Sequence, residues 1–279
     1  MNAPSRPLQR HRADETTSRQ VSAAFDAVAA RFDTTLENEI TRGLRTKIYS
    51  VVSSYVRPGA AILDMNCGTG IDLEHFIKAG YRATGVDLSP AMIAAARSRL
   101  ESSDKQGPRF YHISFEDLSA VPQKDFDLVF SNFGGMNCVR DLEQTARSIA
   151  GVLKPGAYFI GVLMPPFSIW ESASFAARFR WSDAVRRFRA HTPATGFDDK
   201  TFPVFYHSPK TVVKEFSKDF ILKRIVGLSI FSPTPQSTSF VRRHPRLWKV
   251  LGRLDSLVER IPLIRSIGDH YLIVLEKRG

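Results

Sequence analysis

The sequence is poor in cysteine and has no long apolar run. Among its 279 residues are only two cysteines, Cys67 and Cys138, too few for a disulfide framework or a cysteine-based metal cluster. We therefore expect reduced thiols, a cytoplasmic protein and no metal site. No stretch reaches the roughly 20 apolar residues that a membrane-spanning helix requires. The longest run, AYFIGVLM at 157–164, stops at Pro165-Pro166 and is typical of a buried strand.

Acidic residues are also in deficit. The chain has 28 Asp and Glu against 39 Lys and Arg, which gives a formal net charge of +11. Such an excess favours anionic partners, or it is simply a basic solvated surface. Residues 1–20 are basic and polar, and they lack the apolar stretch of a secretory signal. We expect them to form a disordered basic arm.

Strand and helix patterns alternate from about residue 60. Residues 21–58 come first and predict an N-terminal helical cap, because their apolar residues recur at three- and four-residue spacing. Residues 59–166 predict the core, with helical patterns between successive strands. The strands are expected at 60–65, 82–89, 109–114, 125–132 and 157–164. This alternation indicates a parallel sheet covered by helices on both faces.

The alternation stops after Pro166. Residues 167–208 are rich in Phe, Trp and Arg, and we expect a substrate-binding insertion or lid there. Residues 209–279 return to the core pattern as a helix and two strands. Between those strands, residues 244–261 form an amphipathic excursion whose apolar stripe is interleaved with Arg and Lys.

The most informative stretch is AILDMNCGTGID at residues 61–72. A glycine loop between a strand and a helix lets a ligand approach the backbone, and the helix N-terminus attracts negative charge. The dinucleotide pattern G-x-G-x-x-G is broken, because Ile71-Asp72-Leu73 follows Gly70. The phosphate-binding pattern G-x-x-x-x-G-K-[ST] does not occur.

Four motifs in order resemble the class I S-adenosylmethionine-dependent methyltransferases. They are ILDMNCGTG (62–70), TGVDLSPAM (84–92), FDLVFSNFGGMN (126–137) and LKPGAYF (153–159). The resemblance covers about 60–164, and more loosely 209–277. Asp87 follows Asp64 by 23 residues, close to the roughly 20 expected when an acid reaches a ribose across one strand–helix–strand unit.

The resemblance implies both a fold and an activity. The expected fold is α/β, a doubly wound, mostly parallel seven-stranded sheet (the Rossmann-like methyltransferase fold). An N-terminal helical segment precedes it, and a helical insertion follows strand five. The expected activity is that of a methyltransferase of the EC 2.1.1 type with S-adenosyl-L-methionine as cofactor.

The same resemblance assigns the cofactor site. Gly68 and Gly70 would let the methionine part of the cofactor lie against the backbone. Asp64 would brace the loop or bind the ammonium, and Asp87 would accept hydrogen bonds from the ribose hydroxyls. Asn66 stands where many relatives have Gly, and we expect it to adopt a left-handed conformation. The other expected contacts are Cys67 in the loop, Leu88 and Met92 on the adenine, Ser114 and Phe115 (or Asp117 instead) at its edge, and Ser131 and Asn132 at the methionine end.

The acceptor side is less clearly marked. The stretch 131–137 lacks the Asn/Asp-Pro-Pro-Tyr/Phe tetrad of many enzymes that methylate amide or base nitrogens. Phe133 and Asn137 would shape this side, although Asn137 also suits a structural turn. No catalytic residue is defined, and the candidates are His207 and Tyr206, for which the alternative is a surface loop. The insertion would add Trp170 as a substrate contact. The arginines of the insertion would contact an anionic acceptor or a membrane surface. Alternatively, the insertion forms a helix that simply packs on the sheet edge.

We therefore expect methyl transfer to an oxygen, nitrogen or carbon of a small, lipophilic or anionic metabolite. The enzyme would be cytoplasmic or peripheral to a membrane. The alternative is an RNA methyltransferase, or a non-catalytic regulator that binds nucleic acid and S-adenosylmethionine. The sequence contains no recognisable RNA-binding module, which disfavours nucleic acid as a partner. It does not define the oligomeric state.

Overall fold

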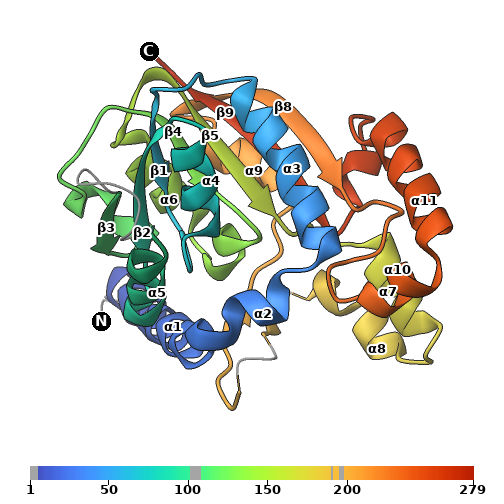
Figure 1. Cartoon of the computed structure of the whole chain (residues 1–279). Coiled ribbons are helices and arrows are strands. Elements are labelled where there is room, and N and C mark those ends of the chain that lie inside the picture. The colour runs from blue at the N-terminus through green and yellow to red at the C-terminus, as the bar shows by residue number, and fades with distance from the viewer. Residues whose placement is uncertain (1–5, 101–107, 190, 195–197) are drawn as a thin grey trace.

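A computed structural model of the chain describes residues 6–100, 108–189, 191–194 and 198–279 (Figure 1). Its main sheet has seven strands in the order β3-β2-β1-β4-β5-β9-β8. The pairs from β3 to β5 are parallel, and β9 runs antiparallel between β5 and β8. This confirms the expected doubly wound, mostly parallel sheet. The strands are β1 (Ala61–Asp64), β2 (Arg82–Asp87), β3 (Arg109–His112), β4 (Phe126–Ser131), β5 (Leu153–Leu163), β8 (Phe220–Leu228) and β9 (His270–Lys277).

Helices cover both faces of the sheet and bury its central strands. One apolar layer packs under α3, α4 and α5, and the other under α6 and α9. Strands β1, β4 and β9 are buried almost throughout, which explains their near-continuous apolar sequences. The covering helices are α3 (Glu39–Ser53), α4 (Ile71–Lys78), α5 (Pro90–Leu100), α6 (Leu142–Ala150) and α9 (Pro209–Phe216).

The N-terminal helix begins earlier in the chain than the sequence indicates. Helix α1 spans Arg6–Val28, so the predicted disordered arm over residues 1–20 is wrong from Arg6 onward, and residues 1–5 lie outside the described part. A turn (η1, Ala29–Arg31) and the short helix α2 (Phe32–Leu36) lead into α3. Helix α3 begins at a capping box, in which Asn38 Oδ1 accepts from Thr41 N–H and Thr41 Oγ1 accepts from Asn38 N–H.

The insertion after β5 includes a small hairpin of β6 (Thr192–Pro193) and β7 (Pro203–Val204), which packs on α1. The rest of the insertion belongs to a lobe beside the sheet and contains α7 (Ile169–Ala176), α8 (Trp181–Ala184) and the turn η4 (Arg186–Phe188). Helices α10 (Thr238–Arg243) and α11 (Pro245–Val258) lie next to it, at the right of Figure 1. The Trp170 ring packs on Phe240, 4.8 Å between centroids, and joins α7 to α10.

A buried ion network fixes the insertion to the start of β9. Arg187 is 5% exposed and pairs with Glu171 and Asp269, each at 2.7 Å. Arg186 also pairs with Glu171, at 2.8 Å. These two arginines therefore already have carboxylate partners, which argues against their predicted use on an anionic acceptor or a membrane.

Candidate active site

The loop after β1 is held in shape by backbone geometry. Gly68 and Gly70 have φ of +51° and +85°, a left-handed region that costs side-chain-bearing residues about 1–2 kcal/mol. Asn66 is not among the described residues with positive φ, so its predicted left-handed conformation is wrong. Its Nδ2 instead donates to the carbonyl of Asn132 at 2.9 Å. Asn66 therefore ties the loop to the end of β4.

The two loop glycines serve different purposes. A Cβ on Gly70 would lie 3.1 Å from the Cβ of Ala96, so Gly70 is needed for close packing of α4 on α5. A Cβ on Gly68 would meet only the Phe32 ring, at 4.0 Å. Gly68 is thus the loop position whose backbone is open to a ligand. Cys67 is turned away from that side, because its thiol packs in the core near Gly85.

Asp87 stands at the end of β2 and is only partly buried. Its Oδ2 accepts from Gly68 N–H and its Oδ1 from Ser89 N–H, both at 2.9 Å. Burial raises the pKa of this carboxyl, and the hydrogen bonds from Ser89 and Gly68 oppose that rise. Each carboxylate oxygen has a further lone pair, so the group can hold the loop and still accept from a diol.

A second acid at the same edge of the sheet lacks full hydrogen bonding. Asp64 ends β1 and is 1% exposed, and its Oδ2 has no hydrogen-bond partner among the described residues. Burial, and then the charge of Asp72, raise the pKa of Asp64 well above its ordinary value. Ser131, at the end of β4, has an equally buried Oγ without a described partner. Unpaired buried polar atoms are rare, and these two suit a bound ligand with polar groups of its own.

Asp72 organises the polar groups around this end of the site. Its carboxylate accepts from Asn132 Nδ2 at 3.2 and 3.1 Å, and it also pairs with Arg45 and Tyr49 of α3. Arg45 and Tyr49 were not predicted as site residues. They lie more than 20 positions before Asp72 in the sequence, and no motif connects them to it.

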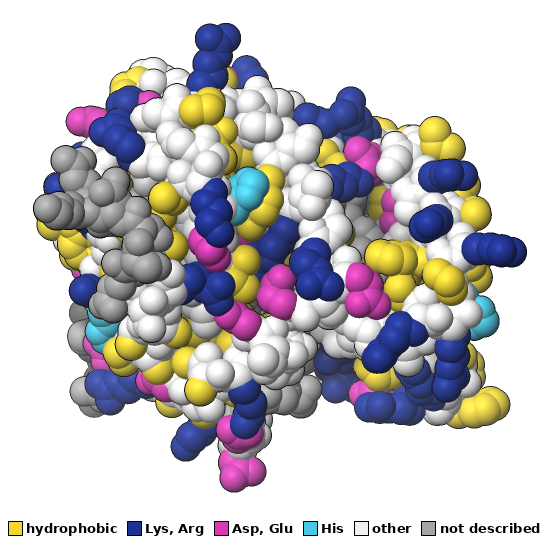
Figure 2. Space-filling model, in the orientation of Figure 1, with side chains coloured by type: hydrophobic (Ala, Val, Ile, Leu, Met, Phe, Trp, Pro, Cys, Tyr) yellow, Lys and Arg dark blue, Asp and Glu magenta, His cyan; other side chains and the backbone are white. Residues whose placement is uncertain are grey.

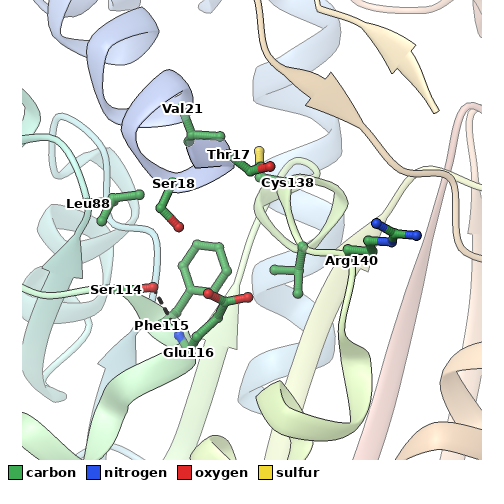
Figure 3. Close-up of a pocket in the computed structure, with 10 residues that line it drawn as sticks. Thr17, Ser18, Val21, Leu88, Ser114, Phe115, Glu116, Cys138 and Arg140 are labelled. Atoms are coloured by element: carbon green, nitrogen blue, oxygen red, sulfur yellow. Dashed lines mark hydrogen bonds between the residues drawn. The ribbon is translucent and has the colours of Figure 1, made fainter. Parts of the chain in front are cut away.

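A pocket opens beside Asp87 at the carboxyl edge of β2 and β3. Leu88, Ser114 and Phe115 line it, as expected for an adenine site, and Figure 3 shows them on one side with α1 opposite. Asp117, the competing candidate, is exposed and does not line this pocket. Met92 is 1% exposed and packs with Val28 and Ala29, so its predicted contact with the adenine is not supported by this geometry.

Helix α1 forms the opposite wall of the pocket. Thr17, Ser18 and Val21 of α1 face Leu88 across it (Figure 3). Ser22 Oγ donates to the Leu88 carbonyl at 3.0 Å, and Asp26 accepts from Ala91 N–H at 3.1 Å. The enclosed cavity is about 20 Å³, which is room for about one water molecule. This cavity is too small for a nucleoside.

The acceptor side lies at the end of β4. Phe133 has φ of +42°, an uncommon conformation for an aromatic residue that is often found at functional sites. The guanidinium of Arg45 lies 4.8 Å from the centre of its ring. Phe133 is partly buried against the core layer, and its predicted contact with the acceptor stays a prediction.

Two other predicted substrate residues are structural. Asn137 is fully buried; its Nδ2 donates to the carbonyls of Met164 and Phe205, and its Oδ1 accepts from Met164 N–H. These atoms are all hydrogen-bonded to backbone groups, so Asn137 stabilises the turn. Its predicted role in shaping the acceptor site is wrong. Trp170 donates from Nε1 to Ser237 Oγ at 3.0 Å, within the junction of α7 with α10.

The two predicted catalytic candidates are not placed for catalysis. His207 is 8% exposed, and its Nε2 lies 2.8 Å from the carbonyl of Val139, to which it must donate. Burial lowers the pKa of His207, so the ring stays neutral within the fold. The Tyr206 hydroxyl shares a hydrogen bond with Thr192 Oγ1 at 2.9 Å. His207 is therefore neither in a surface loop nor free to act as a base, and Tyr206 is bound to the insertion hairpin.

A histidine that the sequence did not single out lies on the acceptor side. The ring of His270, at the start of β9, packs edge-on against Phe133 with 5.9 Å between centroids. Its Nδ1 lies 3.0 Å from Asp269 Oδ2, but the two groups are not aligned for a hydrogen bond. Burial opposes ionisation of Asp269, but its electrostatic interactions with His270 and Arg187 outweigh it and hold its pKa well below the ordinary value. The only sequence signal was the pair Asp269-His270 before the last strand.

Comparison with known proteins agrees with this geometry. Residues 62–156 match the model of a family described as a methyltransferase domain. A malonyl-[acyl-carrier protein] O-methyltransferase of Serratia marcescens is 27% identical over 66% of this chain and 67% of its own length. A dTDP-3-amino-3,4,6-trideoxy-alpha-D-glucopyranose N,N-dimethyltransferase of Streptomyces venezuelae is 32% identical over 50% of this chain and 55% of its own.

The fold is also found in solved structures. A geranyl diphosphate C-methyltransferase of Streptomyces coelicolor, in complex with S-adenosyl-L-homocysteine, superposes with a TM-score of 0.54 at 17% identity. The match covers 88% of this chain and 84% of that one. The strand order, the four motifs and the family match over residues 62–156 together support a class I S-adenosylmethionine-dependent methyltransferase. S-adenosylmethionine is the cofactor of this class. The chain spans about two thirds of the Serratia protein and about half of the S. venezuelae one.

Proposed function

We propose that this protein transfers the methyl group of S-adenosylmethionine to an oxygen, nitrogen or carbon of a small organic acceptor. One observation carries the proposal. The carboxyl edge of the sheet holds two acids at the two motif positions, Asp64 and Asp87, one with an unpaired buried oxygen and one with spare lone pairs. A ligand with an ammonium at one end and a ribose diol at the other meets both requirements.

The chain's own residues would hold that ligand as follows. Asp87 would accept hydrogen bonds from the ribose hydroxyls while it keeps those of Gly68 and Ser89. Asp64 Oδ2 would accept from the ammonium, and Leu88 and Phe115 would enclose the adenine. When bound, the cofactor supplies a methyl group on a sulfonium, already activated for in-line displacement. The protein then mainly positions the acceptor and excludes water, and closure of α1 over the pocket would contribute to both.

We assign the acceptor side to Phe133 and His270. Phe133 offers an apolar ring to an organic acceptor, and His270 stands beside it. If Asp269 Oδ2, 3.0 Å from Nδ1, turns into line with it on binding, it would keep the proton on Nδ1 and leave Nε2 to take one from a hydroxyl or amine. Such a base is needed only if the acceptor is protonated at neutral pH.

The relatives named above favour a small acceptor over RNA, since they are an O-methyltransferase and an amino-sugar N,N-dimethyltransferase. The cysteines Cys67 and Cys138 are free thiols, which supports the expected cytoplasmic location. We find no specific observation in favour of the nucleic-acid alternative.

Transfer of labelled methyl from S-adenosylmethionine tests the proposal. The protein would be incubated with a small-molecule extract and, separately, with total RNA. We expect label in the small-molecule fraction, no label in RNA, and loss of transfer in Asp87→Ala. The exposed Asp117 gives a matched control, Asp117→Ala, which should transfer normally. Label in RNA alone would contradict the proposal.

A further inference from the structure

Helix α11 carries its apolar stripe on the outside of the molecule. Leucine, valine and isoleucine recur at three- and four-residue steps along it and just past its end, and so lie on one face. This stripe consists of Leu247, Val250, Leu254, Leu257 and Ile261, all of which are exposed, Leu257 by 77%. An amphipathic helix normally turns such a stripe toward the core. Here the core side instead carries Trp248, Leu251 and Asp255.

A stripe of positive charge runs beside the apolar one. Arg246, Lys249, Arg253 and Arg260 follow at steps of three, four and seven residues, and all are exposed. The acids of this stretch face the opposite way. Asp255 is 5% exposed and accepts from Phe231 N–H at 2.7 Å, and Glu259 is 9% exposed and pairs with Lys47. The outer side of this fully described helix therefore presents cations and apolar side chains without an acid.

The rest of the lobe adds exposed apolar groups of the same kind. Leu263, just after α11, is 84% exposed, and Phe179, Trp181 and Phe188 of the insertion are 81%, 64% and 65% exposed. Hydrophobic and basic side chains stand side by side over α11 at the right of Figure 2. Clusters of exposed large apolar residues mark interaction surfaces more often than isolated ones do.

We propose that the outer face of α11 binds the surface of an anionic lipid bilayer. The apolar stripe would enter the boundary between headgroups and acyl chains, and the cationic stripe would lie among the headgroups, as in helices that rest in the membrane interface. None of the described helices is long and apolar enough to cross a membrane, so the contact is with one leaflet. This proposal goes beyond methyl transfer and does not depend on it.

Charge and side-chain type select this partner over two others. A symmetric dimer through the stripe would place the cations around Arg253 close to those of the second copy, which is unfavourable. Single-stranded nucleic acid is bound through stacking on aromatic rings, whereas this stripe consists of Leu, Val and Ile. An anionic membrane offers negative headgroups to the cationic stripe and acyl chains to the aliphatic stripe.

Sedimentation with lipid vesicles tests the proposal. Vesicles of equal parts phosphatidylglycerol and phosphatidylcholine would be compared with vesicles of phosphatidylcholine alone. We expect wild type to bind the anionic vesicles, and more weakly as salt is raised. Leu254→Gln with Leu257→Gln should weaken binding by about tenfold or more. Arg246→Gln with Arg253→Gln should weaken it by about tenfold or more on anionic vesicles only, since each cation near an anionic leaflet contributes about fivefold.

Matched controls are available on β8. Ile221 and Leu222 are 42% and 38% exposed, close to the 43% of Leu254, and Ile221→Gln with Leu222→Gln should bind vesicles as wild type does. Circular dichroism and unchanged S-adenosylhomocysteine affinity would show that each variant is folded. Wild type that ignores anionic vesicles, or a leucine variant that binds as wild type, would overturn the proposal. So would a dimer in analytical ultracentrifugation that the leucine variant converts to monomer, because a second copy would then cover the stripe.

Discussion

Replacing Asp64 by Asn should stabilise the cofactor-free protein and weaken cofactor binding at the same time. The Oδ2 of Asp64 is buried without a described partner, and burial raises the pKa of this carboxyl well above normal. Asn retains the shape of the side chain and removes the buried charge and its repulsion by Asp72, and an uncompensated buried polar group costs about 1–3 kcal/mol. The free energy of unfolding should therefore rise by about 1–3 kcal/mol at neutral pH. That corresponds to about 2–6 °C in Tm for a chain of this size.

Binding should change in the opposite direction. A hydrogen bond from the cofactor ammonium to a charged acceptor contributes about 1.5–3 kcal/mol, so affinity for S-adenosylhomocysteine should fall by about 10- to 150-fold. Thermal unfolding without ligand and isothermal titration calorimetry measure the two effects. Asp117→Asn, at an exposed acid, should change neither. A variant that is less stable and binds normally would show that Asp64 braces the loop and does not contact the ligand.

The pH dependence gives a second check on the same variant. A carboxyl whose pKa is raised in the fold contributes its full stability below the unfolded value of about 3.9, and that stability is lost as pH rises toward the folded pKa. The advantage of Asp64→Asn over wild type should thus be large at pH 7–8 and shrink as pH approaches about 4. An advantage that is constant with pH would refute the role given to the buried charge.

Two further predictions concern histidines. Burial lowers the pKa of His207 below its value in the unfolded chain. The neutral ring therefore contributes its full stability above about pH 6.5, and this contribution is lost as pH falls toward the pKa in the folded protein. In His207→Gln, the free energy of unfolding should decrease less as pH falls, by up to about 1.4 kcal/mol per pH unit. Urea unfolding at pH 7 and pH 5 measures this, and an identical pH response in both proteins would contradict it. His270→Gln should lower kcat for a protonated acceptor by about 10²–10⁴-fold, with S-adenosylhomocysteine affinity unchanged. An unaltered kcat would remove His270 from the mechanism.

Local sequence patterns were enough to bring the proposed cofactor residues to one edge of the sheet. Asp64, Gly68 and Asp87 each sit at the junction of a strand with a loop, where a few neighbouring residues determine the geometry. Their predicted positions agree with the structure, because parallel strands place their carboxyl ends at one edge of the sheet. Leu88 and Phe115 follow from the same register.

Groups that depend on distant contacts could not be placed in this way. Asn137 is structural because the carbonyls of Met164 and Phe205 reach it, and neither is near it in sequence. The pairing of Arg187 with Asp269 spans 82 residues, so His270 was overlooked along with it. The helix over residues 6–20 was missed for another reason. Its polar composition resembles a disordered arm, and no local pattern indicates that its continuation packs on α5.

Calorimetric titration of S-adenosylhomocysteine into wild type and Asp87→Ala tests the central claim most directly. The claim is that the loop after β1 and the acid after β2 hold the cofactor. We predict saturable binding to wild type with one ligand per chain. In the folded variant, affinity should fall by about 10- to 150-fold, the range for lost hydrogen bonds to a charged acceptor. Equal affinity in the two proteins, or no binding to wild type, would contradict the claim.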